Sequence, residues 1–227
     1  MYLGHLGDNF SGGSVQVNIG CGATPTDGWI NLDNSWVVRM ARWPLVLQLL
    51  SSTRILPTNS REFAKVANHK RIRFANASLR IPFASNSVEV IYSSHMIEHL
   101  DRREAGAFLL EVRRVLRSGG IIRLAAPDLA RLVRNYVTTG DANQFIAGTR
   151  MGQLRPIGIF PRLRAALIGP RHHLWMYDGR SLAVLLRDAE FTSVRIMSPG
   201  MTNIADPGAL NLAERADESV YVEAVRP

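Results

Sequence analysis

The stretch from Ser14 to Asp33, SVQVNIGCGATPTDGWINLD, decides the fold. An apolar run predicts a β-strand, Gly20 and Gly22 predict a sharp turn, and a second strand leads to the acid Asp33. Glycine permits positive φ and lets a ligand approach bare backbone. The crossover is too short for the usual helix, however, and Pro25 stands where a third glycine would be expected. The stretch is therefore either a cofactor pocket or an ordinary structural turn.

The rest of the chain alternates between short apolar runs and amphipathic segments. Helices are expected at 102–116, 129–137 and 180–189, and Ser118-Gly119-Gly120 is expected to end the first of them. Seven strands are expected, at 15–19, 29–32, 72–75, 88–93, 121–125, 191–197 and 219–224. Strand–helix alternation predicts a parallel sheet, while the helix-free loop 198–218 predicts an antiparallel return. The sequence thus predicts an α/β fold with a mostly parallel seven-stranded sheet and one antiparallel strand near its edge.

The chain is expected to form a single domain over residues 1–227, with two insertions at about 34–71 and 139–174 that act as a cap or lid. The second insertion carries the arginines Arg155, Arg162, Arg164 and Arg171. Three alternatives are open for them: a lid that binds an anionic acceptor, contact with an anionic membrane surface, and a plain helical cap. The first insertion is expected to replace the missing crossover helix or to fold over a cofactor.

Composition limits the function classes. The net charge is +8, mostly from arginines spread over what are expected to be solvated helix faces, so a nucleic-acid partner is not expected. Cys21 is the single cysteine, which rules out an intramolecular disulfide. The N-terminal residues lack a signal-peptide pattern, and no apolar run approaches the roughly 20 residues of a membrane span. A cytoplasmic enzyme or binding protein is expected, with its oligomeric state left open.

Polar residues follow several of the expected strands. Asp33 ends the second strand, where an acid accepts hydrogen bonds from ribose hydroxyls in nucleotide-binding sheets. The alternative for Asp33 is a solvated helix cap. The fourth strand opens onto the segment SSHMIEHL at 93–100, and ligands of open α/β sheets bind at this carboxyl edge. The missing GxGxxG pattern disfavours a dinucleotide cofactor.

Taken together, VNIGCG, NLD, IPFASNSVEVIYSSHMIEHL and LRSGGIIRLAAPD resemble class I S-adenosylmethionine-dependent methyltransferases. The GCG…GWINLD and SSH…EHL segments resemble a small bacterial branch that often accompanies glycosyltransferases in glycan pathways. The resemblance implies a Rossmann-like seven-stranded methyltransferase sheet with helices on both faces, and S-adenosyl-L-methionine as cofactor. It further implies a set of cofactor-binding residues: Gly20, Cys21 and Gly22 at the amino-acid part, Asp33 at the ribose, Asn76 and Ala77 at the adenine, and Ser93 and Ser94 below the sulfonium. Many relatives carry Asp near Asn76.

His95 is the candidate catalytic base, because it directly follows the fourth strand and an imidazole accepts a proton near neutral pH. The alternative is that His95 shapes the pocket or caps a helix. If the segment is helical, His95 and His99 share a face, but the sequence identifies no third ligand, so no metal site is expected. Asp128, His173 and Tyr177 are candidate substrate-binding residues. The alternatives are that Asp128 caps the helix at 129 and that the aromatic residues belong to the core.

The sequence therefore predicts methyl transfer from S-adenosylmethionine to a small-molecule acceptor, a hydroxyl of a sugar or a related glycan metabolite. Two alternatives use the same fold. One is methylation of nucleic acid, which the positive charge favours and the lack of an appended basic domain disfavours. The other is a non-catalytic cofactor-binding protein, because a fold does not fix a function.

Overall fold

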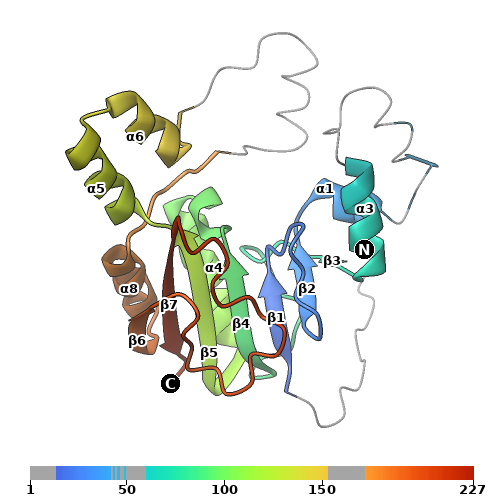
Figure 1. Cartoon of the computed structure of the whole chain (residues 1–227). Helices are drawn as coiled ribbons and strands as arrows, with labels where there is room; N and C mark the ends of the chain where they lie inside the picture. Colours follow the sequence, from blue (N-terminus) through green and yellow to red (C-terminus); the bar gives the residue numbers. More distant parts are fainter. Residues whose placement is uncertain (1–13, 42, 44, 47–48, 50–59, 153–171) are drawn as a thin grey trace.

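The structure, a computed structural model, describes residues 14–41, 43, 45–46, 49, 60–152 and 172–227. One seven-stranded sheet runs through this part of the chain in the order β3-β2-β1-β4-β5-β7-β6 (Figure 1). The strands are β1 (Gln16–Ile19), β2 (Ile30–Asp33), β3 (Arg73–Phe74), β4 (Val88–Ser94), β5 (Leu116–Pro127), β6 (Thr192–Met197) and β7 (Ser219–Val225). Strands β1 to β5 are parallel, and β7 is antiparallel to both β5 and β6. The predicted sheet, with one antiparallel strand near its edge, is confirmed.

Alternate residues of the central strands pack into two different cores, as the twofold period of a strand requires. Ile91 and Val222 belong to the main core, which also contains the buried faces of α4 (Arg102–Val115) and α8 (Gly179–Asp188). Tyr92, the neighbour of Ile91, faces the opposite core. That second core is closed by apolar side chains from the loop between β6 and β7, which crosses in front of the sheet in Figure 1.

The loop at 198–218 is attached to the sheet by a buried ion pair. Arg123 is fully buried and donates to the carbonyl oxygens of Met201 (2.9 Å) and Leu212 (2.8 Å). Its guanidinium also lies 2.7 Å from the Glu223 carboxylate on β7, which in turn accepts hydrogen bonds from residues 202 and 203. A loop without regular structure is therefore held in one position above the central strands.

The described part of the first insertion packs beside the sheet edge. Helices α1 (Trp36–Met40) and α3 (Ser60–His69) share a small core with Cys21 and Ile72, next to β3 (Figure 1). Ser35 begins α1, because its side chain accepts a hydrogen bond from Val37 N (3.2 Å). The loop between β6 and β7 also supplies apolar cover beside the short β1–β2 crossover. Trp29, at the end of this crossover, belongs to the core that the loop closes.

Strand β5 differs from the prediction. The Ser118-Gly119-Gly120 triplet was expected to follow the helix as a stop, but it lies inside β5, which starts at Leu116 immediately after α4. Gly119 has a φ of 75°, and the pairing with β4 shifts register between Val88 and Val90. Glycine accommodates this irregularity, and the backbone of Arg226 pairs with both glycines. Tertiary pairing therefore extends the strand through a sequence that is typical of a turn.

Aspartate side chains cap the N-termini of α4, α5 and α6. Asp101 caps α4 in a capping box: its carboxylate accepts from Glu104 N (2.7 Å), and the Glu104 side chain accepts from Asp101 N (3.0 Å). Three further helices are a 3₁₀ turn η1 (Ile97–His99), α5 (Leu129–Thr139) and α6 (Ala142–Thr149). The arginines at 155, 162, 164 and 171, for which three roles were open, lie outside the described residues.

Candidate active site

The strand order reverses between β1 and β4, and this position defines the candidate site. From β1 the chain proceeds outward to β2 and β3, and then crosses to β4 on the other side of β1. The two strands are in register, with Ile19 opposite Ser93, so their carboxyl ends are adjacent. Open α/β sheets bind ligands at such a switch point, because the diverging connections leave a crevice.

The glycine turn lies at the β1 side of this switch point. Gly20 and Gly22 have φ values of 72° and 49°, in the region that favours glycine. Gly20 N and Cys21 N both donate to Leu32 O, at 2.8 and 3.2 Å, which fixes the turn to β2. A Cβ at Gly20 would lie 2.7 Å from Met96 Cγ, whereas a Cβ at Gly22 would meet nothing within 4 Å among the described residues. Gly20 therefore permits close packing against the β4 end, and Gly22 borders open space.

Asp33 joins the ends of β1 and β2. Its Oδ2 accepts from Gly22 N (3.0 Å) and its Oδ1 accepts from Ser35 N (2.7 Å). The residue is 8% exposed, and burial raises its pKa, opposed by these two backbone hydrogen bonds. A carboxylate has about four lone-pair positions, so two remain for other donors. Asp33 can therefore hold the glycine turn in place and still accept hydrogen bonds from ribose hydroxyls, as predicted.

Asn76 and Ala77 follow β3 in a turn. Asn76 Oδ1 accepts from Ser78 N (3.2 Å) and from Ser78 Oγ (2.8 Å), so this side chain organises the turn locally. Ala77 is 7% exposed and belongs to the main core. The structure therefore places the pair at the carboxyl edge of the sheet, and their proposed contact with adenine stays a prediction.

Ser93 and Ser94 end β4 beside the glycine turn. Ser93 pairs with Ile19 of β1 and Leu124 of β5, so it lies at the centre of the sheet. Its side chain is 2% exposed, and its hydroxyl has no hydrogen-bond partner among the residues that the structure describes. Buried hydroxyl groups in native proteins are normally paired, so Ser93 is available to a further ligand at the predicted position.

His95 leaves the strand with a φ of 49° and is held at both ring nitrogens. Its Nε2 lies 2.8 Å from Ser219 Oγ, and its Nδ1 lies 3.2 Å from the Arg215 guanidinium. An arginine can only donate, so Nδ1 accepts and Nε2 carries the proton. Burial, assisted by the charge of Arg215, lowers the pKa of His95 to about 3. The imidazole is therefore neutral near pH 7, as a base must be, but it is a weak one.

Glu98, to which the sequence analysis gave no role, lies next to His95. Its carboxylate is 1% exposed, and burial raises its pKa to about 7. Glu98 Oε1 lies 3.6 Å from His95 Nδ1 and 3.9 Å from His173 Nε2. The only sequence signal was an acid inside a segment that follows a buried strand. Sequence alone does not show that this carboxylate turns inward.

The condition for a shared face of His95 and His99, an α-helix over both residues, is not met. Residues 95 and 96 precede η1, which is a 3₁₀ turn rather than the start of an α-helix, so four-residue spacing does not apply. His99 lies instead against His173, with ring centroids 5.0 Å apart. His173, predicted to bind substrate, is 3% exposed, and its Nε2 lies 3.9 Å from Glu98 Oε1, the same oxygen that lies near His95.

Asp128 and Tyr177 meet through their backbones in an isolated bridge, and Leu129 N donates to Tyr177 O (2.8 Å). Asp128 caps α5, because its Oδ1 accepts from Ala130 N (3.0 Å). Tyr177 is fully buried in the main core. The structure therefore shows the cap and the core positions that the sequence analysis had kept as alternatives, and direct substrate contact stays a prediction for both.

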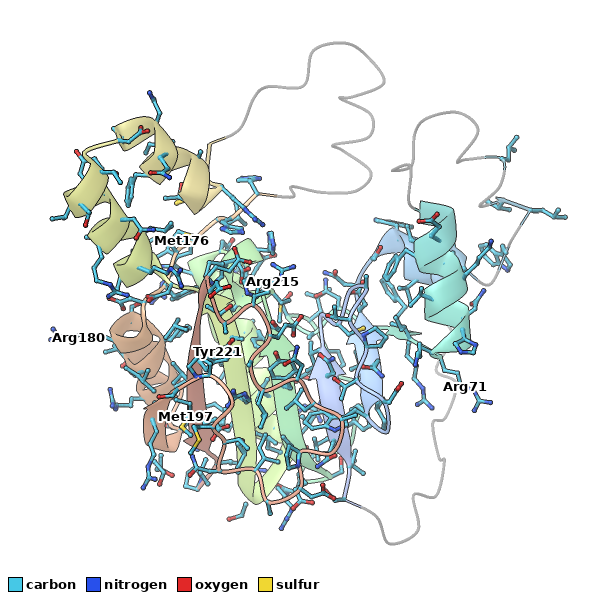
Figure 2. All side chains as sticks on the ribbon, viewed as in Figure 1. Arg71, Met176, Arg180, Met197, Arg215 and Tyr221 are labelled. Atoms are coloured by element: carbon cyan, nitrogen blue, oxygen red, sulfur yellow. The ribbon has the colours of Figure 1, made fainter. Side chains whose placement is uncertain are left out.

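The loop between β6 and β7 contributes two further residues that the sequence analysis missed. Glu214 accepts from Tyr92 Oη (2.8 Å) and from Thr24 Oγ1 (3.1 Å), which links β4 to the glycine turn. Arg215, the next residue, reaches the His95 ring and lies above Tyr221 at the upper end of the sheet in Figure 2. In the sequence, this loop showed only polar composition and no motif.

Comparison with known proteins agrees with this geometry. A family model described as "Methyltransferase domain" matches residues 47–124, which include β3, β4 and the Glu98 segment but not the glycine turn. A S-adenosylmethionine-dependent methyltransferase of Thermotoga maritima, described as a possible histamine N-methyltransferase, is 13% identical. Its TM-score is 0.50, and the match covers 95% of this chain and 83% of that one. A search of curated proteins returns no match.

A second solved structure, the CurJ carbon methyltransferase, is 14% identical with a TM-score of 0.50 and is matched over 94% of this chain and 48% of its own. At such identities the likeness concerns the fold, which is the Rossmann-like methyltransferase fold. Among the helices within the described part of the chain, none is long and apolar enough to cross a membrane. The matched family model covers about a third of the chain, and together with the fold it supports S-adenosylmethionine-dependent methyltransferase activity with S-adenosyl-L-methionine as cofactor.

Proposed function

We propose that the protein transfers a methyl group from S-adenosyl-L-methionine to a hydroxyl of a small-molecule acceptor, a sugar or a related glycan metabolite. One observation carries this proposal: the glycine turn, Asp33 and the His95–Glu98 pair meet at the switch point of a methyltransferase fold. The first two can hold the cofactor, and the pair lies where an acceptor would approach it.

In this proposal the cofactor lies along the carboxyl ends of β1, β2 and β4. Its amino-acid part borders Gly22, beside which the described structure leaves open space. Its ribose hydroxyls donate to the remaining lone pairs of Asp33, and its adenine lies by Asn76 and Ala77. Ser93 supplies an unpaired buried hydroxyl below the sulfonium. The sulfonium methyl is already activated, so the protein contributes alignment and exclusion of water.

A hydroxyl acceptor must lose a proton as its oxygen bonds to the methyl carbon. We propose that His95 takes this proton at Nδ1, which requires Arg215 to release that atom. The resulting imidazolium would lie 3.6 Å from the Glu98 carboxylate, whose negative charge would stabilise it. Burial and the charge of Arg215 make His95 a weak base. Release of Nδ1 by Arg215 would weaken the second of these effects.

Calorimetry with S-adenosylhomocysteine tests cofactor binding directly. We expect one site per chain, and a 10- to 100-fold weaker affinity in Asp33→Ala, because hydrogen bonds to a charged group contribute about 1.5–3 kcal/mol. Asp27→Ala is the matched control, since Asp27 is an exposed acid in the same crossover. Circular dichroism shows whether Asp33→Ala still folds. Absence of S-adenosylhomocysteine binding by the unaltered protein would overturn the proposal.

The acceptor class needs a second experiment. Methyl-labelled cofactor is incubated with sugars, sugar phosphates, amines and RNA, and transfer to each is counted. We expect transfer to a sugar hydroxyl, as for a cytoplasmic enzyme of glycan biosynthesis, and we expect His95→Asn to lower it. Transfer to an amine, to a carbon or to RNA would refute the hydroxyl assignment, and cofactor binding without any transfer would favour the non-catalytic alternative.

The domain arrangement completes the proposal. We propose that residues 1–227 belong to one methyltransferase domain, with the insertions at about 34–71 and 139–174 acting as a cap or lid. In the described residues, α1 and α3 of the first insertion flank the β3 edge, α5 connects β5 to the second insertion, and α6 lies within that insertion. Limited proteolysis with and without S-adenosylhomocysteine tests this, because a cap should become protected when the cofactor is bound.

A further inference from the structure

Glu98, His99 and His173 form a compact cluster beside the candidate site, named here the Glu98 cluster. One ligand atom from each residue can be chosen such that all three lie within 4.8 Å of one another. Glu98 and His99 belong to η1, at the carboxyl end of β4, whereas His173 comes from a segment more than 70 residues later. Two imidazoles and a carboxylate are a ligand set typical of divalent transition metals.

Backbone hydrogen bonds hold the two segments together. Glu98 O accepts from Leu174 N (2.7 Å) and from Trp175 N (3.1 Å), and His173 N donates to Arg150 O (3.2 Å). These contacts fix the residues after His173 against η1, and His173 itself against Arg150 at the end of α6. The three side chains are therefore placed by a rigid frame, which lowers the entropic cost of arranging them around an ion.

The Glu98 carboxylate is the unusual member. It is 1% exposed, and neither of its oxygens has a hydrogen-bond partner among the described residues. Nearby lie His95 and His173, at 3.6 and 3.9 Å, distances too long for hydrogen bonds. A buried carboxylate without partners is costly, so an additional ligand or a bound proton must satisfy it.

The histidines are oriented as metal ligands usually are. His99 Nδ1 lies 3.0 Å from the carbonyl oxygen of His172, so this nitrogen donates and Nε2 keeps its lone pair. His173 Nδ1 lies 3.3 Å from Met176 Sδ, and its Nε2 is the nitrogen nearest Glu98. A hydrogen bond from one ring nitrogen commonly fixes the other as a metal ligand.

We propose that Glu98, His99 and His173 bind one divalent transition-metal ion of the zinc class. Tetrahedral Zn²⁺ with bonds of about 2.0–2.1 Å needs donor atoms roughly 3.4 Å apart, so ligand atoms that are up to 4.8 Å apart must approach one another by up to about 1.4 Å. Side-chain rotation can supply this contraction. Arg150 and Arg215 carry positive charge close enough to Glu98 to affect it, and they would repel a metal ion. Coordination by the three ligands must therefore outweigh this repulsion.

Three protein ligands leave a fourth position for water or for an oxygen of the acceptor, as in catalytic zinc sites. Because Glu98 is the neighbour of His95, that position lies next to the proposed acceptor site. There the ion would lower the pKa of a bound hydroxyl, a step that rests on the proposed function. Binding of the ion itself does not depend on methyl transfer.

Titration of the chelator-treated full chain with Co²⁺ tests the proposal. We expect one Co²⁺ per chain, visible absorption bands of a low-coordinate ion, and displacement of Co²⁺ by Zn²⁺. Glu98→Gln and His173→Gln should weaken binding about 100-fold or more, whereas His69→Gln, an exposed histidine on α3, should not. Zn²⁺ should also raise the thermal unfolding midpoint of the unaltered chain but not that of Glu98→Gln.

Three results would overturn the proposal. The first is absence of stoichiometric Co²⁺ binding, which would mean that a proton satisfies Glu98. The second is binding that Glu98→Gln and His173→Gln leave unchanged while circular dichroism shows both variants folded. The third is a thiolate-to-cobalt absorption band that Cys21→Ser abolishes, which would place the ion elsewhere. S-adenosylhomocysteine affinity, measured on the same samples, separates failure of this site from failure of the proposed function.

Discussion

Gly20→Ala tests the packing between the ends of β1 and β4. The new Cβ would lie 2.7 Å from Met96 Cγ and 2.9 Å from Met96 Cβ. Met96 Cγ can move by a rotamer change, but Met96 Cβ is fixed to the backbone, so the two strand ends must separate. The φ of 72° at Gly20 adds a second cost, because an alanine disfavours the left-handed region.

The two costs can be separated with Gly22→Ala. Gly22 also has a positive φ, 49°, but its added Cβ would meet no described atom within 4 Å. The left-handed conformation costs alanine about 1–2 kcal/mol, and overpacking adds typically about 1–3 kcal/mol. We therefore expect Gly20→Ala to lower the free energy of unfolding by about 2–5 kcal/mol, and Gly22→Ala by about 1–2 kcal/mol.

Urea denaturation followed by circular dichroism measures both changes, provided that the slope with denaturant stays constant. Met96→Ala removes Cγ and keeps Cβ, so the double variant with Gly20→Ala should recover about 0.5–2 kcal/mol relative to additivity. S-adenosylhomocysteine calorimetry on Gly22→Ala should show weakened binding, because its Cβ occupies the proposed cofactor space. Equal destabilisation by Gly20→Ala and Gly22→Ala, or additivity with Met96→Ala, would refute the packing argument.

Three further predictions concern the frame around the site. Glu223→Gln should destabilise the fold by about 3–5 kcal/mol, because it leaves the fully buried Arg123 charge without its partner. Urea denaturation measures this change, and a value below about 1 kcal/mol would contradict the prediction. Burial raises the pKa of Cys21 to about 12. At pH 8 a thiol reagent should therefore label Cys21 about 1,000-fold more slowly in the folded chain than in the chain unfolded by urea. Rapid labelling of the folded chain would disprove this. Asp101→Ala should cost about 1 kcal/mol in thermal unfolding by removing the α4 capping box, whereas Asp101→Asn should retain most of that stability.

The sheet was predictable because its signals are local. Each strand is a short apolar run, and each strand end was predicted within about two residues, except at the start of β5. There, Ser118-Gly119-Gly120 is typical of a turn, but pairing with β4 and with Arg226 keeps it in the strand. Hydrogen bonds to distant residues outweighed the local preference of the triplet.

In the candidate site, too, some residues carry a local sequence signal and others do not. Gly20, Gly22, Asp33 and His95 could be proposed as site residues from the sequence, because each lies at a strand end in a segment that resembles known methyltransferases. Glu98 was passed over, because nothing local shows that its carboxylate turns inward, where burial raises its pKa to about 7. His95 and His99 would share a face only in an α-helix, and the segment instead forms a 3₁₀ turn at Ile97–His99.

The sequence by itself determined the α/β class, the strand order along the chain and the glycine turn with its acid, since periodicity and glycine placement are local properties. Only the tertiary structure decided which residues surround His95. Arg215 and His173 are separated from it by 120 and 78 positions in the chain, and they come close because Arg123 anchors one loop and Glu98 O anchors the other segment. Such contacts depend on burial and on hydrogen bonds between distant segments, which no local pattern encodes.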